Sequence, residues 1–539
     1  MKQLTRRILA GGAAILALTL AACSSGSADA EPDTNGTDAS DASQEERIYV
    51  EALNVTPEGM TIHFAPTPIG AMFSAQIYDP LIRMSPEWEM SPGLAESWDL
   101  SDDGLELVLN LREGVTWHDG EPFTAEDVKF NFDEMMGLHR YGSLLIDAVE
   151  SAEIRDDSTV VVNFSEPFGP TLPVLADLYI LPKHVYEGTD YVTNPANMAP
   201  VGTGAMKFES YTDGDEVVLA KNENYWDGEV AVDRAFYPII GDPDSRANAM
   251  FAGELDRAAI DPSQQGRVVD SEHLSHLDNE SFKQYLLVMF HADSEYFSEP
   301  EVRSAVFAAM NREQILELAL GGLGSVAQGF FPEELDWAVN DDVHFDTDFP
   351  HDLDAINDVL DEYYPRGADG TRFTIDLDFI SEQSHLASAS EVAKSQLAEV
   401  GIEVNLVGSV GLNWIDKVYT QRDYDMTISA TVLGGDPSTS LVPWYICNPE
   451  KVVGWNPTGV CDEDLDAAAD TARDSIDTAT RGEALDVVQD RARDLMFHAP
   501  LAWYTGSFST VSTERWTGVD GTPKHAGIRP WTDMEWVGN

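Results

Sequence analysis

AESWDLSDDGLELVLNLREGVTWHDGEPFTAEDVKFNFD, residues 95–133, is the stretch that decides the fold. Leucines stand at positions 105, 107, 109 and 111, and this period of two predicts a strand with one buried face. Asp-Gly and Glu-Gly pairs flank the strand and favour turns. Thr124, followed three residues later by Asp127, has the spacing of a capping box, so a helix should begin there. The stretch therefore predicts strand, turn and helix in that order.

A second pattern lies far downstream. Residues 373–379 alternate as a strand, residues 384–400 have helical spacing that ends before Gly401, and residues 402–406 alternate again. Because a strand–helix–strand unit places its two strands parallel, this part of the chain predicts an α/β fold. A chain of 539 residues is also too long for one core, so we expect two or three domains.

The charge balance excludes one class of partner. The chain has 95 acidic and 32 basic residues, for a net charge of −63. Nucleic-acid binding needs clustered lysine and arginine, and no basic stripe is present. We interpret the acidity as a solvated surface, suited to a salty habitat in which repulsion is screened, rather than as acidic metal sites.

The N-terminal residues predict export. Basic residues precede an apolar run at 8–20, which is too short to span a bilayer and fits a signal peptide over residues 1–22. Leu-Ala-Ala-Cys at 20–23 resembles the lipobox of bacterial lipoproteins, which implies that Cys23 becomes a lipidated N-terminus. An ordinary signal peptide is the alternative, and the Arg6-Arg7 pair leaves Sec or twin-arginine export open.

The chain after the signal peptide predicts a tether and a disulfide. Residues 23–45 are rich in small and acidic residues, which is typical of a disordered linker. We therefore expect a lipid-anchored protein on the outer face of the cytoplasmic membrane. Cys447 and Cys461 lie 14 positions apart, and outside the cytoplasm such a pair favours a disulfide.

Several collinear motifs resemble one family. Residues 95–133, above all the WHDGEPFTAEDV segment, resemble the signature of the peptide/nickel-type family 5 of extracellular solute-binding proteins, the receptors of ABC importers. Matching motifs follow at 181–184 (LPKH), 200–208 (PVGTGAMKF), 222–228 (NENYWDG) and 250–256 (MFAGELD). The resemblance implies an α/β, two-lobed, periplasmic-binding-protein-like (type II) fold with an extra small domain and a ligand cleft between the lobes.

The same resemblance implies domain boundaries. Lobe I should be discontinuous and consist of residues 46–83, 200–286 and 505–539. The small domain should span residues 84–199, and lobe II residues 287–504. The two crossings between the lobes, near Leu287 and Tyr504, are predicted to act as hinges.

Motifs of catalysis are absent from the sequence. It has no His-Glu-x-x-His, Gly-x-Ser-x-Gly or Walker motif and no paired-cysteine metal knuckle. We predict a receptor that is not an enzyme, with no cofactor or metal of its own, which acts as a monomer with ABC permease subunits. A secreted hydrolase of peptides or oligosaccharides and a non-transport surface sensor are the alternatives.

The resemblance places ligand contacts around the acidic-Pro motif at Asp436. Relatives that bind free peptides carry an aspartate three residues before the acidic position and often an arginine eight residues before it. This chain has Leu433 and Ile428 at those positions. The departures argue against recognition of a free peptide N-terminus. A peptide remains the favoured solute, and a blocked peptide, a sugar, an opine-like compound or a metal chelate stays open.

The predicted contacts have distinct roles. A loop that ends at Met72 should approach the ligand, and Arg422 is a candidate clamp for a carboxylate. Aromatic residues between positions 414 and 445 are candidates for a floor under a sugar or an apolar side chain, although each alone is more often a core residue. The predicted ligand-binding residues are Met72, Trp414, Arg422, Tyr424, Leu433, Asp436, Trp444 and Tyr445.

Overall fold

The computed structural model describes residues 46–277, 283–505 and 508–538, with the backbone alone at Arg140. The chain divides into two units, residues 1–45 and 46–539, and only the second is described below. The predicted signal peptide, the tether and Cys23 lie outside the described residues. Among the described helices, none is both long and apolar enough to cross a membrane.

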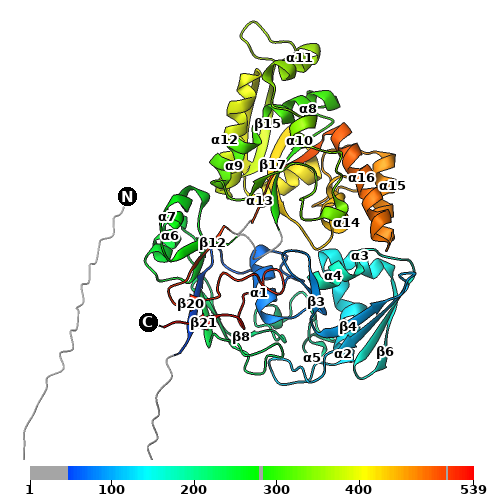
Figure 1. Ribbon diagram of the computed structural model, residues 1–539, viewed down its shortest axis with the longest axis vertical. Helices are drawn as coiled ribbons and strands as arrows, with labels where there is room; N and C mark the ends of the chain where they lie inside the picture. Colours follow the sequence, from blue (N-terminus) through cyan, green and yellow to red (C-terminus); the bar gives the residue numbers. More distant parts are fainter. Residues whose placement is uncertain (1–45, 278–282, 506–507, 539) are drawn as a thin grey trace, which may run out of the picture. The chain divides into compact units, whose positions relative to one another are not determined.

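The first part of the fold, lobe I, is built on a seven-stranded mixed sheet (Figure 1). Its central strand β1 (Ile48–Ala52) runs parallel to β10 and β11, and the other strands join antiparallel. Three separate stretches of chain supply this sheet. In order its strands are β12 (Leu274–His276), β19 (Ser509–Ser512), β11 (Arg257–Ala259), β1, β10 (Arg234–Pro238), β9 (Glu216–Lys221) and β8 (Met206–Thr212).

Lobe II is built on a six-stranded sheet. As predicted, β15 and β16 are parallel, and α12 connects them and packs on them. Strand β13 begins at Gln284, three residues before the predicted start of lobe II at Leu287. In order the strands are β14 (Ser325–Val326), β18 (His498–Tyr504), β13 (Gln284–Phe290), β17 (Met426–Val432), β15 (Phe373–Ile380) and β16 (Ile402–Ser409).

The small domain contains the opening stretch on a four-stranded antiparallel sheet, β4 (Ala95–Leu100), β5 (Glu106–Leu111), β7 (Thr159–Phe164) and β6 (Val149–Asp156). Three of the four predicted leucines are buried in β5, with exposures of 3% or less. The prediction was wrong for Leu105, which precedes the strand in the Asp-Gly turn and is 37% exposed. Because of this turn, the strand begins at Glu106, one residue later than the alternation of leucines predicted.

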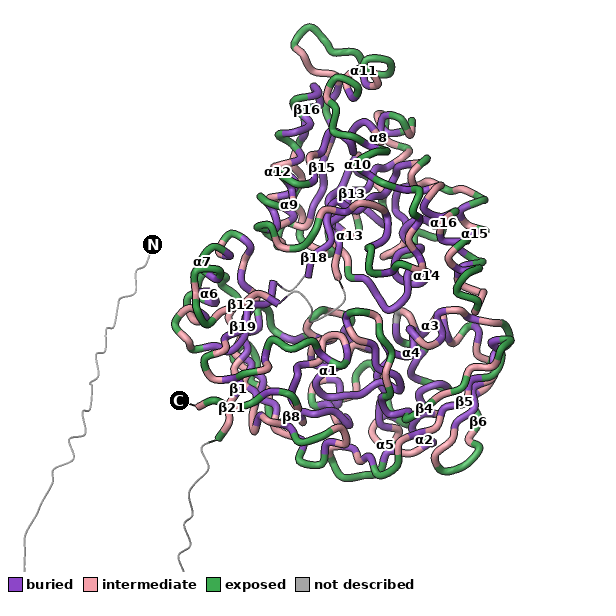
Figure 2. Tube along the Cα trace, in the orientation of Figure 1, coloured by how far each residue is buried: buried purple, intermediate pink, exposed green. Residues whose placement is uncertain are grey.

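Helices cover these sheets, and the buried residues concentrate along the strands (Figure 2). Lobe I has α1 (Pro68–Ile77), α6 (Pro243–Phe251) and α7 (Gln265–Val269). The small domain has α2 (Ala125–Phe130), α3 (Arg140–Ala148), α4 (Thr171–Asp177) and α5 (Lys183–Tyr186). Lobe II has α8 (Pro300–Ala309), α9 (Arg312–Leu320), α10 (Phe345–Asp348), α11 (Leu353–Tyr363), α12 (Ser384–Glu399), α13 (Gly411–Ile415), α14 (Pro437–Ser440), α15 (Glu463–Asp474) and α16 (Thr478–Leu495).

The capping signal at the start of α2 is confirmed. The Asp127 carboxylate accepts a hydrogen bond from the Thr124 amide at 2.9 Å, and the reciprocal capping contact is present. The same carboxylate accepts from the Lys183 amide at 3.0 Å. The Asp127 side chain therefore stabilises the start of α2 and also binds the LPKH motif to this helix.

His118 joins the WHDG motif to the PVGTG motif by two hydrogen bonds. Its Nε2–H donates to the Gly204 carbonyl at 3.0 Å, and its Nδ1 accepts from the Gly202 amide at 3.1 Å. Glycine is required in that loop, because a Cβ at Gly202 would lie 1.8 Å from the carbonyl oxygen of Ile77. The WHDG motif therefore has a structural role in holding the PVGTG loop against the end of α1.

This geometry predicts loss of stability in acid. Burial lowers the pKa of His118 from 6.5 to about 4, because desolvation disfavours the charged ring. Protonation would also remove the Nδ1 acceptor of the Gly202 hydrogen bond. The folded pKa lies below the unfolded one, so this contribution is full above pH ~6.5 and is lost as pH falls toward ~4. It amounts to at most about 3 kcal/mol. Urea unfolding across this range should show the decline, and the decline should be shallower in His118→Gln. An equal pH slope in both proteins would contradict the assignment.

Candidate functional site

The segment after β17 lies where lobe II meets the small domain. Residues 433–436, which we call the interlobe segment, leave the lobe II sheet and lead into α14. The Gly434 carbonyl accepts from Trp88 Nε1 at 3.4 Å, and the Gly435 amide donates to the Asp177 carboxylate at 3.3 Å. Backbone groups of lobe II therefore contact side chains of the small domain.

The two glycines of the interlobe segment permit this close approach. A Cβ at Gly434 would lie 3.1 Å from the Tyr141 hydroxyl, and one at Gly435 would lie 3.2 Å from the Met84 sulfur. Both distances are shorter than an ordinary van der Waals contact. A side chain at either position would push the small domain away from lobe II.

Asp436 lies next to this contact, but its carboxylate is already bound within lobe II. The side chain is 2% exposed, and both oxygens accept from Arg481 Nη2 at 2.6 and 2.7 Å. It also accepts from the Ser438 amide at 2.9 Å and so caps α14. The predicted ligand contact at Asp436 therefore has an evident structural role, in positioning the interlobe segment.

The predicted aromatic residues lie in the core of lobe II. Trp414, Tyr424, Trp444 and Tyr445 are each no more than 5% exposed. Trp414 donates to the Thr427 hydroxyl, and Trp444 stacks on His498 with ring centroids 5.7 Å apart. Tyr445 meets the same histidine edge-on, whereas Tyr424 stacks on His291 elsewhere. The structure therefore brings Trp444 and Tyr445 together around His498, and Trp414 connects to Trp444 through the ring of Tyr419.

The remaining predicted residues are Arg422, Leu433 and Met72. Arg422 Nη2 donates to the Asn448 carbonyl at 2.5 Å, inside the loop that the Cys447–Cys461 disulfide closes. Leu433 is buried, and its amide donates to the backbone carbonyl of Lys283. The prediction of a loop that ends at Met72 was wrong. Thr67 caps α1, Pro68 lies in its first turn, and Met72 lies within this helix.

A buried histidine that no sequence motif marks, His63, lies close to the small-domain side of the interlobe contact. His63 is 6% exposed, and neither ring nitrogen has a hydrogen-bond partner among the described residues. Its ring lies 5.5 Å from that of His139, which is two residues before Tyr141 at the interlobe contact. Burial lowers the pKa of His63 well below its usual value. No motif marks this position, so only the tertiary structure could reveal it.

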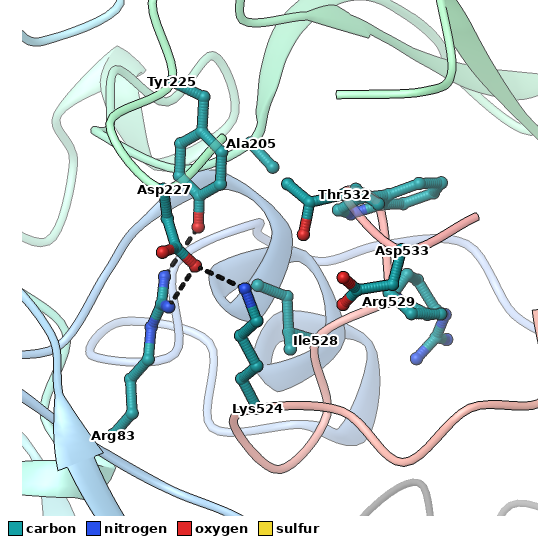
Figure 3. A pocket seen from close by; sticks show the side chains of 11 residues that line it. Arg83, Ala205, Tyr225, Asp227, Lys524, Ile528, Arg529, Thr532 and Asp533 are labelled. Carbon is teal, nitrogen blue, oxygen red and sulfur yellow. Dashed lines mark hydrogen bonds and ion pairs between the residues drawn. The ribbon is translucent and has the colours of Figure 1, made fainter. Parts of the chain in front are cut away.

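The hollow beside Arg83 is too small for a solute (Figure 3). Arg83 donates to Asp227 at 2.7 Å, and Lys524 reaches the same carboxylate at 3.1 Å. The space between these side chains and residues 528–533 is about 20 Å³, enough for one water. Across the described ranges, no group of three His, Cys, Asp or Glu side chains is arranged to hold a metal ion.

Comparisons with known proteins agree on one family. Residues 89–451 match the model of bacterial extracellular solute-binding proteins, family 5. Heme-binding protein A of Haemophilus influenzae is 26% identical over 464 residues, which cover 79% of this chain and 81% of that protein.

Solved structures show the same fold. NikA from Brucella suis, in complex with Fe(III)-EDTA, has a TM-score of 0.81 at 22% identity and covers 91% of this chain and 100% of its own. DppA from Helicobacter pylori, in complex with peptide STSA, has a TM-score of 0.76 at 20% identity and covers 91% and 98%. The two-lobed α/β fold predicted from the sequence is confirmed. The chain belongs to family 5 of the bacterial extracellular solute-binding proteins.

Proposed function

We propose that this protein is the solute receptor of an ABC importer. It captures a small solute between its lobes, and the closed form delivers the solute to the permease. The observation that carries the proposal is the interlobe segment, where Gly434 and Gly435 contact Trp88 and Asp177 across the interlobe region. A solute that touches both sides would favour this closed arrangement.

The proposed solute is peptide-like but does not present a free N-terminus to a carboxylate. Leu433 is apolar and buried, and Asp436 is neutralised by Arg481. The relatives named above bind a heme, an iron chelate and a peptide, so the fold accepts each chemistry. His63 favours a metal chelate as the second candidate, because imidazole is a common metal ligand and its nitrogens have no partner in the described chain.

We place the receptor outside the cytoplasm, held by lipid on Cys23 through the acidic tether at 23–45. This arrangement rests on the sequence motifs at residues 1–45, with Cys447–Cys461 as a disulfide typical of an oxidising compartment. The receptor acts as a monomer, has no cofactor or nucleic-acid partner, and meets the membrane only through its anchor and the permease.

Native mass spectrometry of the secreted full chain tests the proposal. We expect one unmodified solute per chain and a smaller scattering radius in the loaded form than in the emptied form. Turnover of peptides or oligosaccharides would instead support a hydrolase. Normal solute uptake after deletion of the gene would support a sensor.

For the metal-chelate candidate, His63→Gln is expected to reduce the fraction of chains that retain the solute by about tenfold, because it removes the imidazole that we propose as a metal ligand. His344→Gln is the matched control, since His344 is exposed in lobe II. Native mass spectrometry measures both fractions. Equal retention in the two variants would exclude His63 from the site.

A further inference from the structure

A second contact between the small domain and lobe II lies apart from the interlobe segment. Gly169, just before α4, donates its amide to the Arg473 carbonyl at 2.7 Å. Arg473 lies in the last turn of α15, and the turn from Arg473 to Asp477 leads into α16. These elements face each other in Figure 1. The small domain and lobe II therefore touch directly through backbone groups.

Close packing surrounds this hydrogen bond. A Cβ at Gly169 would lie 2.2 Å from the Ser475 carbonyl oxygen and 2.9 Å from Arg481 Nε. At Gly104, in the Asp-Gly turn of the opening stretch, a Cβ would lie 2.7 Å from the Ile476 side chain. The two small-domain turns at Gly104 and Gly169 thus pack against the 473–477 turn of lobe II. We call this set of contacts the latch.

The latch is connected to the interlobe segment on both sides. In the small domain, α4 begins two residues after Gly169 and ends at Asp177, which accepts from the Gly435 amide. In lobe II, Arg481 donates to the Ala472 carbonyl at 2.8 Å and also binds Asp436. Short, buried, hydrogen-bonded elements therefore link the latch to the segment that would meet the solute.

We propose that the latch stabilises the closed state directly, so that contacts remote from the solute help to set its affinity. This inference rests on the proposed receptor function. In a two-state receptor, any contact made only in the closed form raises the closed population and lowers the apparent dissociation constant by the same factor. The latch joins surfaces that separate on opening, and it keeps part of the emptied protein closed.

Gly169→Ala tests the latch selectively. Gly169 does not have a left-handed backbone conformation, so alanine introduces no strain within the small domain. The three atoms nearest to the added methyl group all belong to lobe II, so the clash exists only in the closed form. Gly137→Ala is the matched control, because its nearest neighbour lies 4.0 Å away within the small domain.

The measurements use the full chain after its solute has been removed by unfolding and refolding. We expect a larger scattering radius for Gly169→Ala than for wild type, and about tenfold faster hydrogen exchange at residues 433–436, which corresponds to about 1.4 kcal/mol. Gly137→Ala should match wild type. Ile476→Ser should change both readouts in the same direction as Gly169→Ala, because it removes the apolar contact with the Gly104 turn.

Identical scattering and exchange in Gly169→Ala and wild type would overturn the latch, as would an equal change in Gly137→Ala. The receptor proposal fails by a different result, namely that no solute copurifies and uptake is normal in a deletion strain. A receptor without a latch would bind solute equally well in wild type and Gly169→Ala. The two failures are therefore distinguishable.

Discussion

Replacement of Arg481 by leucine is expected to lower the free energy of unfolding by about 3–5 kcal/mol, because it leaves the Asp436 carboxylate buried without its counter-charge. Arg481 and Asp436 side chains are 7% and 2% exposed, and two charge-assisted hydrogen bonds join them. Arg481 also donates to the Ala472 carbonyl, so this hydrogen bond between α16 and α15 is lost with it. Urea unfolding of the purified chain measures the change.

Two further variants separate charge burial from simple loss of a surface arginine. Arg493→Leu is the matched control on the same helix, since its pair with Asp490 is partly exposed and should be worth about 1 kcal/mol or less. The double variant Arg481→Leu with Asp436→Asn should recover part of the loss, because no charge is then left buried. A loss in Arg481→Leu no larger than that in Arg493→Leu would show that the pair is dispensable.

The Arg481→Leu substitution should also impair solute capture. Asp436 caps α14 and fixes the end of the interlobe segment, so the loss of its counter-charge should disturb the backbone at the neighbouring Gly435. The residue that the sequence marks as a ligand contact thus acts on the solute through the backbone that it positions. Native mass spectrometry of Arg481→Leu should find a smaller loaded fraction than in Arg493→Leu.

The sequence predicted the fold well because local signals determine it. The capping box at Thr124 acts over three residues, and the alternation in 373–379 reports one buried face of β15. The structure confirms both the capping box and the strand. Where two local signals competed, one of them prevailed, as at Leu105, where the Asp-Gly turn excluded the first leucine from the strand.

The candidate site was less predictable because its residues depend on distant partners. Asp436 finds its counter-charge 45 positions away, and Arg422 binds carbonyl groups in the disulfide loop. No pattern in the sequence near either residue predicts these contacts. His63 shows the opposite case, since its lack of partners appears only once the described chain has folded around it. Residue type alone could not tell a ligand contact from a structural pair.

Asp79 connects the end of α1 to the NENYWDG motif. Its carboxylate is 1% exposed and accepts hydrogen bonds from Thr203 Oγ1 at 2.9 Å, Trp226 Nε1 at 2.9 Å and Arg83 Nη2 at 3.0 Å. Asp79→Asn keeps the volume but removes the charge and turns an acceptor into an amide donor that faces other donors. We expect a loss of about 3 kcal/mol in the free energy of unfolding.

Asp227→Asn is the comparison that makes the Asp79 result interpretable. Asp227 binds the same arginine at 2.7 Å, but its side chain is 27% exposed and water can replace the lost contact. We therefore expect a loss of about 1 kcal/mol. If the two variants lose equal stability, the shared ion pair with Arg83 explains both, and the buried hydrogen bonds from Thr203 and Trp226 contribute little. A larger loss at Asp79 assigns the difference to those bonds, which join the PVGTG and NENYWDG motifs of lobe I to the end of α1.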